Sequence, residues 1–301
     1  MKVDRTGLAR FAQLRLHAPS VATSLQQGDR RSPFLGRGVE FADFREYDPG
    51  DDIRLIDWNV YLRLGQVLVR QFNEERSLSI KICLDVSESM AFGEPRKADV
   101  AAEVTAALAT IALVHRDPVT LICFGHDRPP VRAKAVNLDG MAELVHVLEK
   151  VEPHGRGDVY KQLAGQVASG SGGGRTDRLF LVSDLLCEPE EREQLLRLLA
   201  ASSLHPVLVH TLSADELEPD LRDASRVVDA ETGEEIVLRD GAEAAEAYEA
   251  ALQDWLVAIE TRCRTLGIRY LQIPPGVGIA SFVEGELRRA QVVENAAGGN
   301  Q

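Results

Sequence analysis

Apolar strand-like runs alternate with long helical stretches over most of this chain, and few folds accommodate that order. From residue 79 onward, short runs rich in Ile, Leu and Val are separated by helical patterns that are mostly ten or more residues long. Parallel strands need such crossover connections, and these connections are right-handed. We therefore expect an α/β fold with a doubly wound, mainly parallel sheet. A small irregular or β extension would precede it.

The pattern predicts the elements in some detail. We expect strands over residues 79–86, 119–124, 131–136, 178–185, 206–212 and 268–273. We expect helices over residues 96–115, 138–151, 159–168, 188–201 and 242–266. Before them, residues 39–44 and 67–72 are candidate short strands around a turn at 48–51. The predicted organisation is an amino-terminal arm over 1–75, an α/β domain over 76–290 and a frayed tail over 291–301.

The bulk composition narrows the class of protein. The chain has 301 residues, 45% hydrophobic and 27% charged, which suits a globular chain with a sizeable core. A net charge of -13 disfavours nonspecific contact with nucleic acid or anionic lipid, although residues 1–37 are basic and are expected to be a solvated tail. The four cysteines have no paired spacing. We expect a reduced, cytoplasmic protein with no secretion signal and no membrane insertion.

The most informative motif ends the first predicted strand. Its apolar run stops at Asp85, which is followed by Ser87 and Ser89 in the pattern Asp-x-Ser-x-Ser. A strand of this kind delivers a carboxylate and two hydroxyls to the carboxyl edge of the sheet, where open α/β folds bind ligands. Hard oxygen donors of this type suit Mg²⁺ or Mn²⁺ rather than zinc or copper.

Two further segments are expected at the same edge. Asp184 ends the strand that we predict over 178–185, and a loop at 153–158 carries Asp158. A lone aspartate at a strand end more often caps a turn or a helix. Here two aspartates end alternating strands, and one of them is followed by serine hydroxyls two and four residues later. This combination favours a metal site over two separate caps. The predicted site consists of Asp85, Ser87, Ser89, Asp158 and Asp184.

These residues resemble the metal-ion-dependent adhesion site of the von Willebrand factor A domain. The resemblance implies that Ser87 and Ser89 bind the ion directly, while Asp85 and Asp184 act largely through water. It also implies that an acidic group of a partner protein completes the coordination. The family has a threonine in its second loop where this chain has Gly157, which offers no oxygen. Asp158 or water would fill the gap, or the site would bind metal weakly.

A second resemblance is more specific; its motif lies in the amino-terminal segment, and the likeness extends from about Ser32 through Ile273. The chain is similar to the domain-of-unknown-function 58 family, which joins such a segment to a von Willebrand A-like domain. The similarity rests on Gly36-Arg37-Gly38, Glu40-Phe41, the run from Phe44 through Tyr47-Asp48-Pro49-Gly50-Asp51-Asp52 to Arg54, and Ile56-Asp57-Trp58. It implies a partnership with MoxR-type AAA+ ATPases. The aromatic and charged residues of this segment are either a packing device that seats the arm on the α/β domain or a partner-docking surface.

Three functions remain open from the sequence. The first is a noncatalytic, metal-dependent interaction module, an adaptor or co-chaperone of a MoxR-type ATPase. The second is a metal-dependent hydrolase or phosphatase with Asp85 as nucleophile, although Ser87 stands where such enzymes place an acid. The third is a scaffold with a degenerate metal site. The histidines lack ligand spacing, and only His154 is expected near the metal edge.

Overall fold

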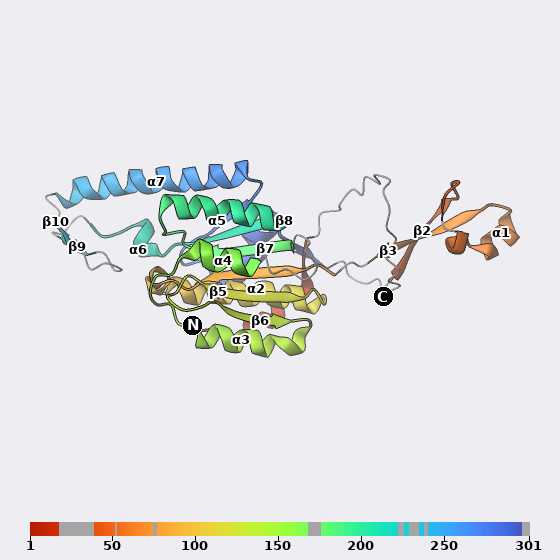
Figure 1. Ribbon diagram of the computed structural model, residues 1–301, viewed down its shortest axis with the longest axis horizontal. Helices are drawn as coiled ribbons and strands as arrows, with labels where there is room; N and C mark the ends of the chain where they lie inside the picture. The colour runs from red at the N-terminus through yellow and green to blue at the C-terminus, as the bar shows by residue number, and fades with distance from the viewer. Residues whose placement is uncertain are drawn as a thin grey trace. The chain divides into compact units, whose positions relative to one another are not determined.

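The computed structural model of the chain describes residues 1–17, 39–51, 53–74, 77–167, 176–221, 226–228, 235–237 and 240–296 (Figure 1). It divides into two compact units. The larger consists of Met1–Ala18 and Leu78–Gln301, and the smaller of Pro19–Ser77. Of the amino-terminal motif, Gly36-Arg37-Gly38 and Asp52 lie outside the described residues.

The elements follow the expected alternation. The strands are β1 (Leu14–Leu16), β2 (Val39–Glu46), β3 (Leu68–Glu74), β4 (Ile80–Asp85), β5 (Val119–Phe124), β6 (Val131–Ala135), β7 (Thr176–Ser183), β8 (Ser203–Thr211), β9 (Arg226–Val228), β10 (Glu235–Val237), β11 (Arg269–Ile273) and β12 (Val293–Asn295). The α-helices are α1 (Trp58–Leu64), α2 (Lys97–Val114), α3 (Met141–Lys150), α4 (Val159–Val167), α5 (Pro189–Ser202), α6 (Ala214–Leu217), α7 (Gly241–Thr265) and α8 (Ile279–Ser281). Shorter helical turns are η1 (Gly7–Gln13), η2 (Ile53–Leu55), η3 (Glu88–Ala91), η4 (Leu138–Gly140) and the π-helical η5 (Phe282–Leu287).

A six-stranded sheet forms the centre of the larger unit. Its strand order is β11-β8-β7-β4-β5-β6, and every neighbouring pair is parallel except β5 and β6. The chain first proceeds from β4 to β5 and β6, and then returns to build β7, β8 and β11 on the other side of β4. The strand order therefore reverses between β4 and β7, which is where folds of this kind bind ligands. The expected mixed α/β architecture with a mainly parallel sheet is confirmed.

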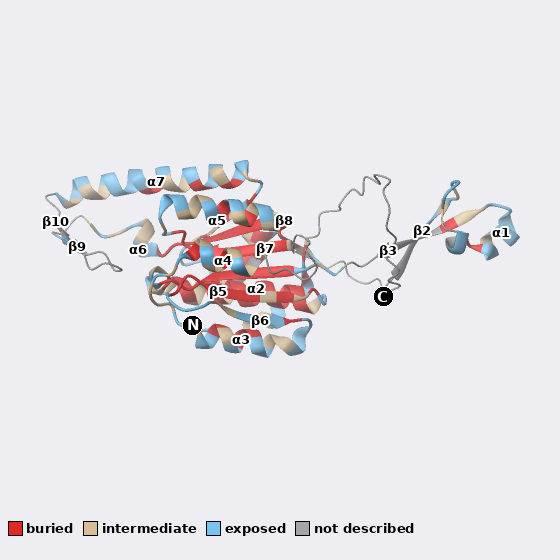
Figure 2. Cartoon of the chain, in the orientation of Figure 1, coloured by how far each residue is buried: buried red, intermediate tan, exposed pale blue. Residues whose placement is uncertain are grey.

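Helices cover both faces of this sheet, as expected for buried parallel strands. All six residues of β4 are buried, and successive side chains enter different cores: Ile82 and Leu84 face α2, while Cys83 faces α4, α5 and α7. Figure 1 shows α2 and α3 on one side of the sheet and α4, α5 and α7 on the other. Figure 2 shows the buried strands between these layers. The alanine-rich α2 is buried on nearly all sides, so it lacks a polar face.

The chain ends differ from the expected solvated arm and frayed tail. Phe11, Leu14 and Leu16 are buried, and η1 packs against α2. Strand β1 pairs antiparallel with β12, which lies within the segment expected to fray. The boundary of the larger unit therefore includes residues 1–18. Leu14 and Leu16 alternate with Arg15, a pattern compatible with this short strand, within the segment that was expected to be a solvated tail.

The smaller unit contains an antiparallel pair, β2 and β3, with a register irregularity between Phe41 and Asp43. The two expected strands are confirmed here. Arg45 pairs with Asp51 at 2.8 Å and with Asp48 at 3.3 Å, so acid-base contacts form around this turn. The side chain of Asp57 caps α1 by accepting from two backbone amides. Trp58 is exposed and lies edge-on to Tyr61.

None of the helices in the described segments is both long enough and apolar enough to cross a bilayer.

Candidate metal centre

The candidate site lies at the carboxyl ends of β4 and β7, at the reversal of the strand order. Asp85 is the last residue of β4, and Ser183 is the last residue of β7, directly before Asp184. The hydroxyl of Ser183 donates to Asp85 Oδ2 at 2.6 Å, which ties the two strand ends together. The structure thus brings the two predicted aspartates to one edge.

Asp85 is a buried carboxylate. Its side chain accepts from the backbone N–H of Ser87 at 3.0 Å as well as from Ser183. Burial raises the pKa of Asp85 to about 6, and the negative charge of Asp184 adds to the rise. These hydrogen bonds lower the pKa but do not compensate for the burial. The site therefore concentrates negative charge in a place from which water is largely excluded.

The two serines of the motif converge beside this carboxylate. Ser87 Oγ and Ser89 Oγ lie 3.1 Å apart, at the start of the short helix η3. Gly125 closes the other side: a Cβ there would lie 2.4 Å from Asp85 Oδ1, and its φ of 98° also favours glycine. The backbone of the β5 loop can therefore approach Asp85 closely.

Asp184 has a partner that the sequence did not reveal. Its Oδ2 lies 2.7 Å from the ammonium of Lys97, and both side chains are 1% exposed. Lys97 also pairs with Glu216, whose other carboxylate oxygen accepts from the Ser213 amide at 2.8 Å. Burial alone would lower the pKa of Lys97, but Asp184 and Glu216 together raise it. A single lysine at a helix start carries no sequence signal of such a role.

The second loop departs from the predicted site. Asp158 Oδ1 accepts from the Lys161 amide at 2.8 Å, and Oδ2 pairs with the Lys161 ammonium at 2.6 Å. Its side chain is 43% exposed, and it begins α4 as a cap. These contacts of Asp158 are with Lys161 of α4 and not with the other four predicted residues. Sequence position alone could not distinguish a helix cap from a ligand.

Gly157 is required by close backbone packing. Its amide donates to the Gly125 carbonyl at 2.8 Å, and a Cβ would lie 2.2 Å from the His126 carbonyl oxygen.

Among the described residues, no three Asp, Glu, His or Cys side chains are assembled to hold a metal ion as they stand. Any ion at this edge would therefore rely on the serine hydroxyls as well as the carboxylates.

Restoring the threonine of the von Willebrand A pattern is expected to fail. We expect Gly157→Thr to lower the free energy of unfolding by about 2 kcal/mol or more, because the new side chain displaces the His126 carbonyl and Gln162. Metal affinity should not rise. Urea unfolding and calorimetry with Mg²⁺ measure both effects, with Gly165→Thr as the control because a Cβ meets nothing there. A stable Gly157→Thr protein with tighter Mg²⁺ binding would contradict this prediction.

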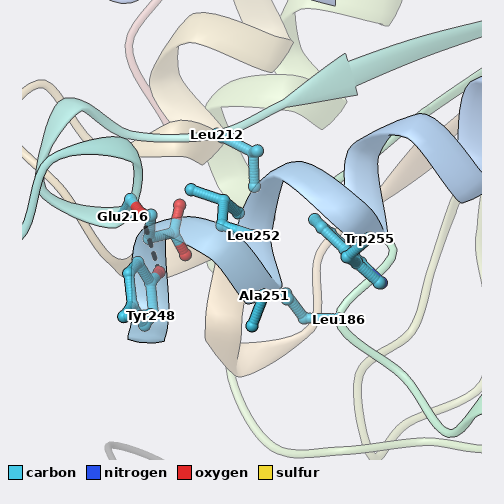
Figure 3. Close-up of a pocket in the computed structure, with 7 residues that line it drawn as sticks. All are labelled: Leu186, Leu212, Glu216, Tyr248, Ala251, Leu252 and Trp255. Carbon is cyan, nitrogen blue, oxygen red and sulfur yellow. Dashed lines mark hydrogen bonds between the residues drawn. The ribbon is translucent and has the colours of Figure 1, made fainter. Parts of the chain in front are cut away.

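An apolar pocket of about 260 Å³ lies beside Glu216 (Figure 3). Helix α7 contributes Tyr248, Ala251, Leu252 and Trp255, while Leu186 and Leu212 come from the loops after β7 and β8. The Tyr248 hydroxyl donates to the Glu216 carbonyl at 2.7 Å. The pocket is thus connected to the candidate site through the residue that also pairs with Lys97.

Comparisons with known proteins find partial matches. Uncharacterised proteins of Mycobacterium bovis and Mycobacterium tuberculosis are each 37% identical over 83 residues, covering 27% of this chain. The chain spans about a quarter of the length of these relatives, 26% of each. An aerotolerance-related membrane protein from Bacteroides fragilis matches 71% of this chain and 98% of its own, with 15% identity and a TM-score of 0.42. The conserved hypothetical protein BatB from Bacteroides thetaiotaomicron gives the same coverage, 14% identity and a TM-score of 0.40.

The match to a family model is broader. Residues 43–255 match the model described as "Protein of unknown function DUF58". This range includes most of the amino-terminal motif and every residue of the candidate site. This chain therefore belongs to the DUF58 family.

Proposed function

We propose that this chain is a noncatalytic interaction module whose von Willebrand A-like domain binds Mg²⁺ or Mn²⁺ at the carboxyl edge of the sheet. Through the ion it would capture an acidic side chain of another protein. We further propose that the other protein is a MoxR-type AAA+ ATPase or one of its clients, so that this chain acts as an adaptor or co-chaperone.

The main support is the placement of the serine hydroxyls. Adjacent ligands of an octahedral Mg²⁺ at 2.0–2.1 Å lie about 3 Å apart. Ser87 Oγ and Ser89 Oγ are 3.1 Å apart, so an ion could replace the single hydrogen bond between them without moving either side chain far. The buried carboxylate of Asp85 lies in the same loop and would supply negative charge.

The donor set suits a hard cation that keeps several waters. Ser87 and Ser89 would bind it directly, and Asp85 would act through water, since both of its oxygens already accept hydrogen bonds. Asp184 shares its charge with Lys97, so it would attract the ion less than an unpaired carboxylate. When bound, the ion would present open coordination positions to a carboxylate from outside.

A hydrolase is the rival proposal, and its chemistry is harder to build here. An aspartyl nucleophile needs a nearby proton donor for the leaving group. Two residues after Asp85 stands Ser87, whose hydroxyl is a poor acid near neutral pH. The nucleophile itself is 4% exposed. These features favour capture of a partner over turnover of a substrate.

The test combines metal binding with partner capture. Calorimetry should detect Mg²⁺ or Mn²⁺ binding to the full chain, and Ser87→Ala with Ser89→Ala should abolish it. A MoxR-type ATPase from the same organism should be retained on immobilised protein in Mg²⁺ and released by EDTA. Ser281→Ala, an exposed serine in the same unit, is the matched control.

Three results would contradict the proposal. The first is no heat at millimolar metal, which favours a scaffold with a degenerate site. The second is ATPase capture that is unchanged in EDTA and in the double variant. The third is hydrolysis of p-nitrophenyl phosphate that is lost in Asp85→Asn, which favours the hydrolase.

A further inference from the structure

We infer that His126, His154 and Asp127 form a second metal site, which takes a divalent transition metal such as Zn²⁺, Co²⁺ or Ni²⁺. This inference goes beyond the proposed function and does not depend on it. The histidines lack ligand spacing along the sequence because these residues come from two loops that meet only in the fold.

The two loops are held together by their backbones. His126 follows β5, and His154 follows α3. The Gly157 amide donates to the Gly125 carbonyl at 2.8 Å. Gln162 of α4 accepts from the Gly125 amide at 2.9 Å and donates to the His126 carbonyl at 2.7 Å. These contacts hold the backbones of the two loops against each other, and the rings of His126 and His154 lie side by side.

His154 is oriented as a metal ligand. Its Nδ1 lies 3.0 Å from the Glu152 carbonyl oxygen, which can only accept, so Nδ1 carries the hydrogen. In the neutral ring Nε2 then has a free lone pair. This is the arrangement found in most metal-binding histidines, whose other nitrogen donates to a carbonyl or carboxylate.

The other ring nitrogen of His154 faces a carboxylate. Nε2 of His154 is buried and lies 3.0 Å from Asp127 Oδ1, yet the two atoms are not aligned as a hydrogen bond. A lone pair and a carboxylate oxygen repel each other at this distance unless a proton or a metal lies nearby. The separation is close to the roughly 3 Å between two ligands of one zinc ion. Gly155, at a φ of 64°, packs its backbone against Asp127 and holds this approach.

His126 supplies the second imidazole. The residue is 2% exposed, and its Nδ1 is buried without a hydrogen-bond partner, which is costly for a polar atom. Its ring centre lies 5.4 Å from that of His154, at an interplanar angle of 62°. Two imidazoles on one metal, at about 2.1 Å per metal–nitrogen bond, have ring centres roughly 5 Å apart.

Two imidazoles and one carboxylate select the metal. Imidazole nitrogen binds zinc, cobalt and nickel better than it binds Mg²⁺, which prefers oxygen. The three side chains are not assembled as a complete ligand set in the described residues. Closing the set takes a side-chain rotation that brings a ring nitrogen of His126 toward the existing contact between His154 and Asp127. Water would occupy the remaining positions.

The experiment is a titration of the full chain with Co²⁺, followed by its visible absorption. We expect one equivalent to give the bands of a nitrogen-ligated ion, and Zn²⁺ to displace it. His126→Asn and His154→Asn together should abolish the bands and weaken Co²⁺ binding by about 100-fold or more. His146→Asn, which changes an exposed histidine of α3, should leave the spectrum unchanged.

The outcomes separate the two sites. Bands that persist in the double variant, or that require Asp85, would overturn the inference. The same holds if wild-type protein gives no bands, since His154 and Asp127 would then be a simple protonated ion pair. If His126→Asn does not fold, His154→Asn alone decides, because this side chain is 36% exposed. Asp85→Asn should keep the Co²⁺ bands, and a failure to bind Mg²⁺ with the bands intact counts against the proposed function only.

Discussion

Replacing Asp85 by asparagine is expected to stabilise the metal-free protein, by about 2 to 3 kcal/mol at pH 7.5. The reason is the environment of this carboxylate. Burial, together with the charge of Asp184, raises its pKa to about 6, from 3.8. The folded state therefore prefers the neutral form, whereas the unfolded chain ionises freely. Asparagine keeps nearly the same shape, can still accept from the Ser87 amide and carries no charge.

The sign of the pH dependence follows from the same shift. Because the pKa is raised on folding, Asp85 contributes full stability only below about pH 4, and this stability is lost as the pH rises through about 6. Wild-type protein in EDTA should lose stability over that interval. In Asp85→Asn the loss should be smaller by the contribution of this one group. Urea unfolding at several pH values measures the difference.

Metal should remove most of the difference in stability between the two proteins. A cation beside Asp85 favours the ionised form, so wild type gains stability with Mg²⁺, by about 2.7 kcal/mol at a hundred times its dissociation constant. The asparagine variant should gain almost nothing. Asp139→Asn, which changes an exposed carboxylate, is the control and should behave as wild type. An Asp85→Asn protein that is less stable than wild type in EDTA would contradict our account of the site.

The part of this centre that sequence could predict is the part built by one strand. The apolar run of β4 fixes its burial, and Asp85, Ser87 and Ser89 follow it directly. Strand ends in a parallel sheet share an edge, so Asp184 could be added from its own strand. These inferences need only local pattern and the direction of the strands.

The rest depends on how distant segments return to the sheet. His126 and His154 meet because the antiparallel β6 and then α3 bring the chain back past the end of β5. Strand β1 finds β12 across almost the whole chain. Asp158 could equally have been a ligand or a helix cap, and the structure gives it the second role. Such choices are made by tertiary packing, which a single sequence does not display.

Lys97 is expected to be the most costly side chain to remove from this edge. We expect Lys97→Met to lower the free energy of unfolding in EDTA by about 3 to 5 kcal/mol, because the buried carboxylate of Asp184 and the partly buried carboxylate of Glu216 lose the cation that they share in the described contacts. The cap of α6 should weaken as well, since Glu216 serves both Lys97 and Ser213. Chemical denaturation measures the loss. Lys134→Met, on the exposed side of β6, is the control.

The response of this variant to metal tests whether lysine and ion share one electrostatic role. Without Lys97, Asp184 becomes an unpaired carboxylate close to Asp85, so the edge should attract Mg²⁺ more strongly. We expect the ion to restore part of the lost stability and to bind more tightly than in wild type. Asp184→Asn in the same background should recover stability without metal and remove the gain from metal. Two results would contradict this shared role of Lys97 and the ion. One is a Lys97→Met substitution that lowers the free energy of unfolding by less than about 1 kcal/mol, and the other is a variant that binds Mg²⁺ no more tightly than wild type.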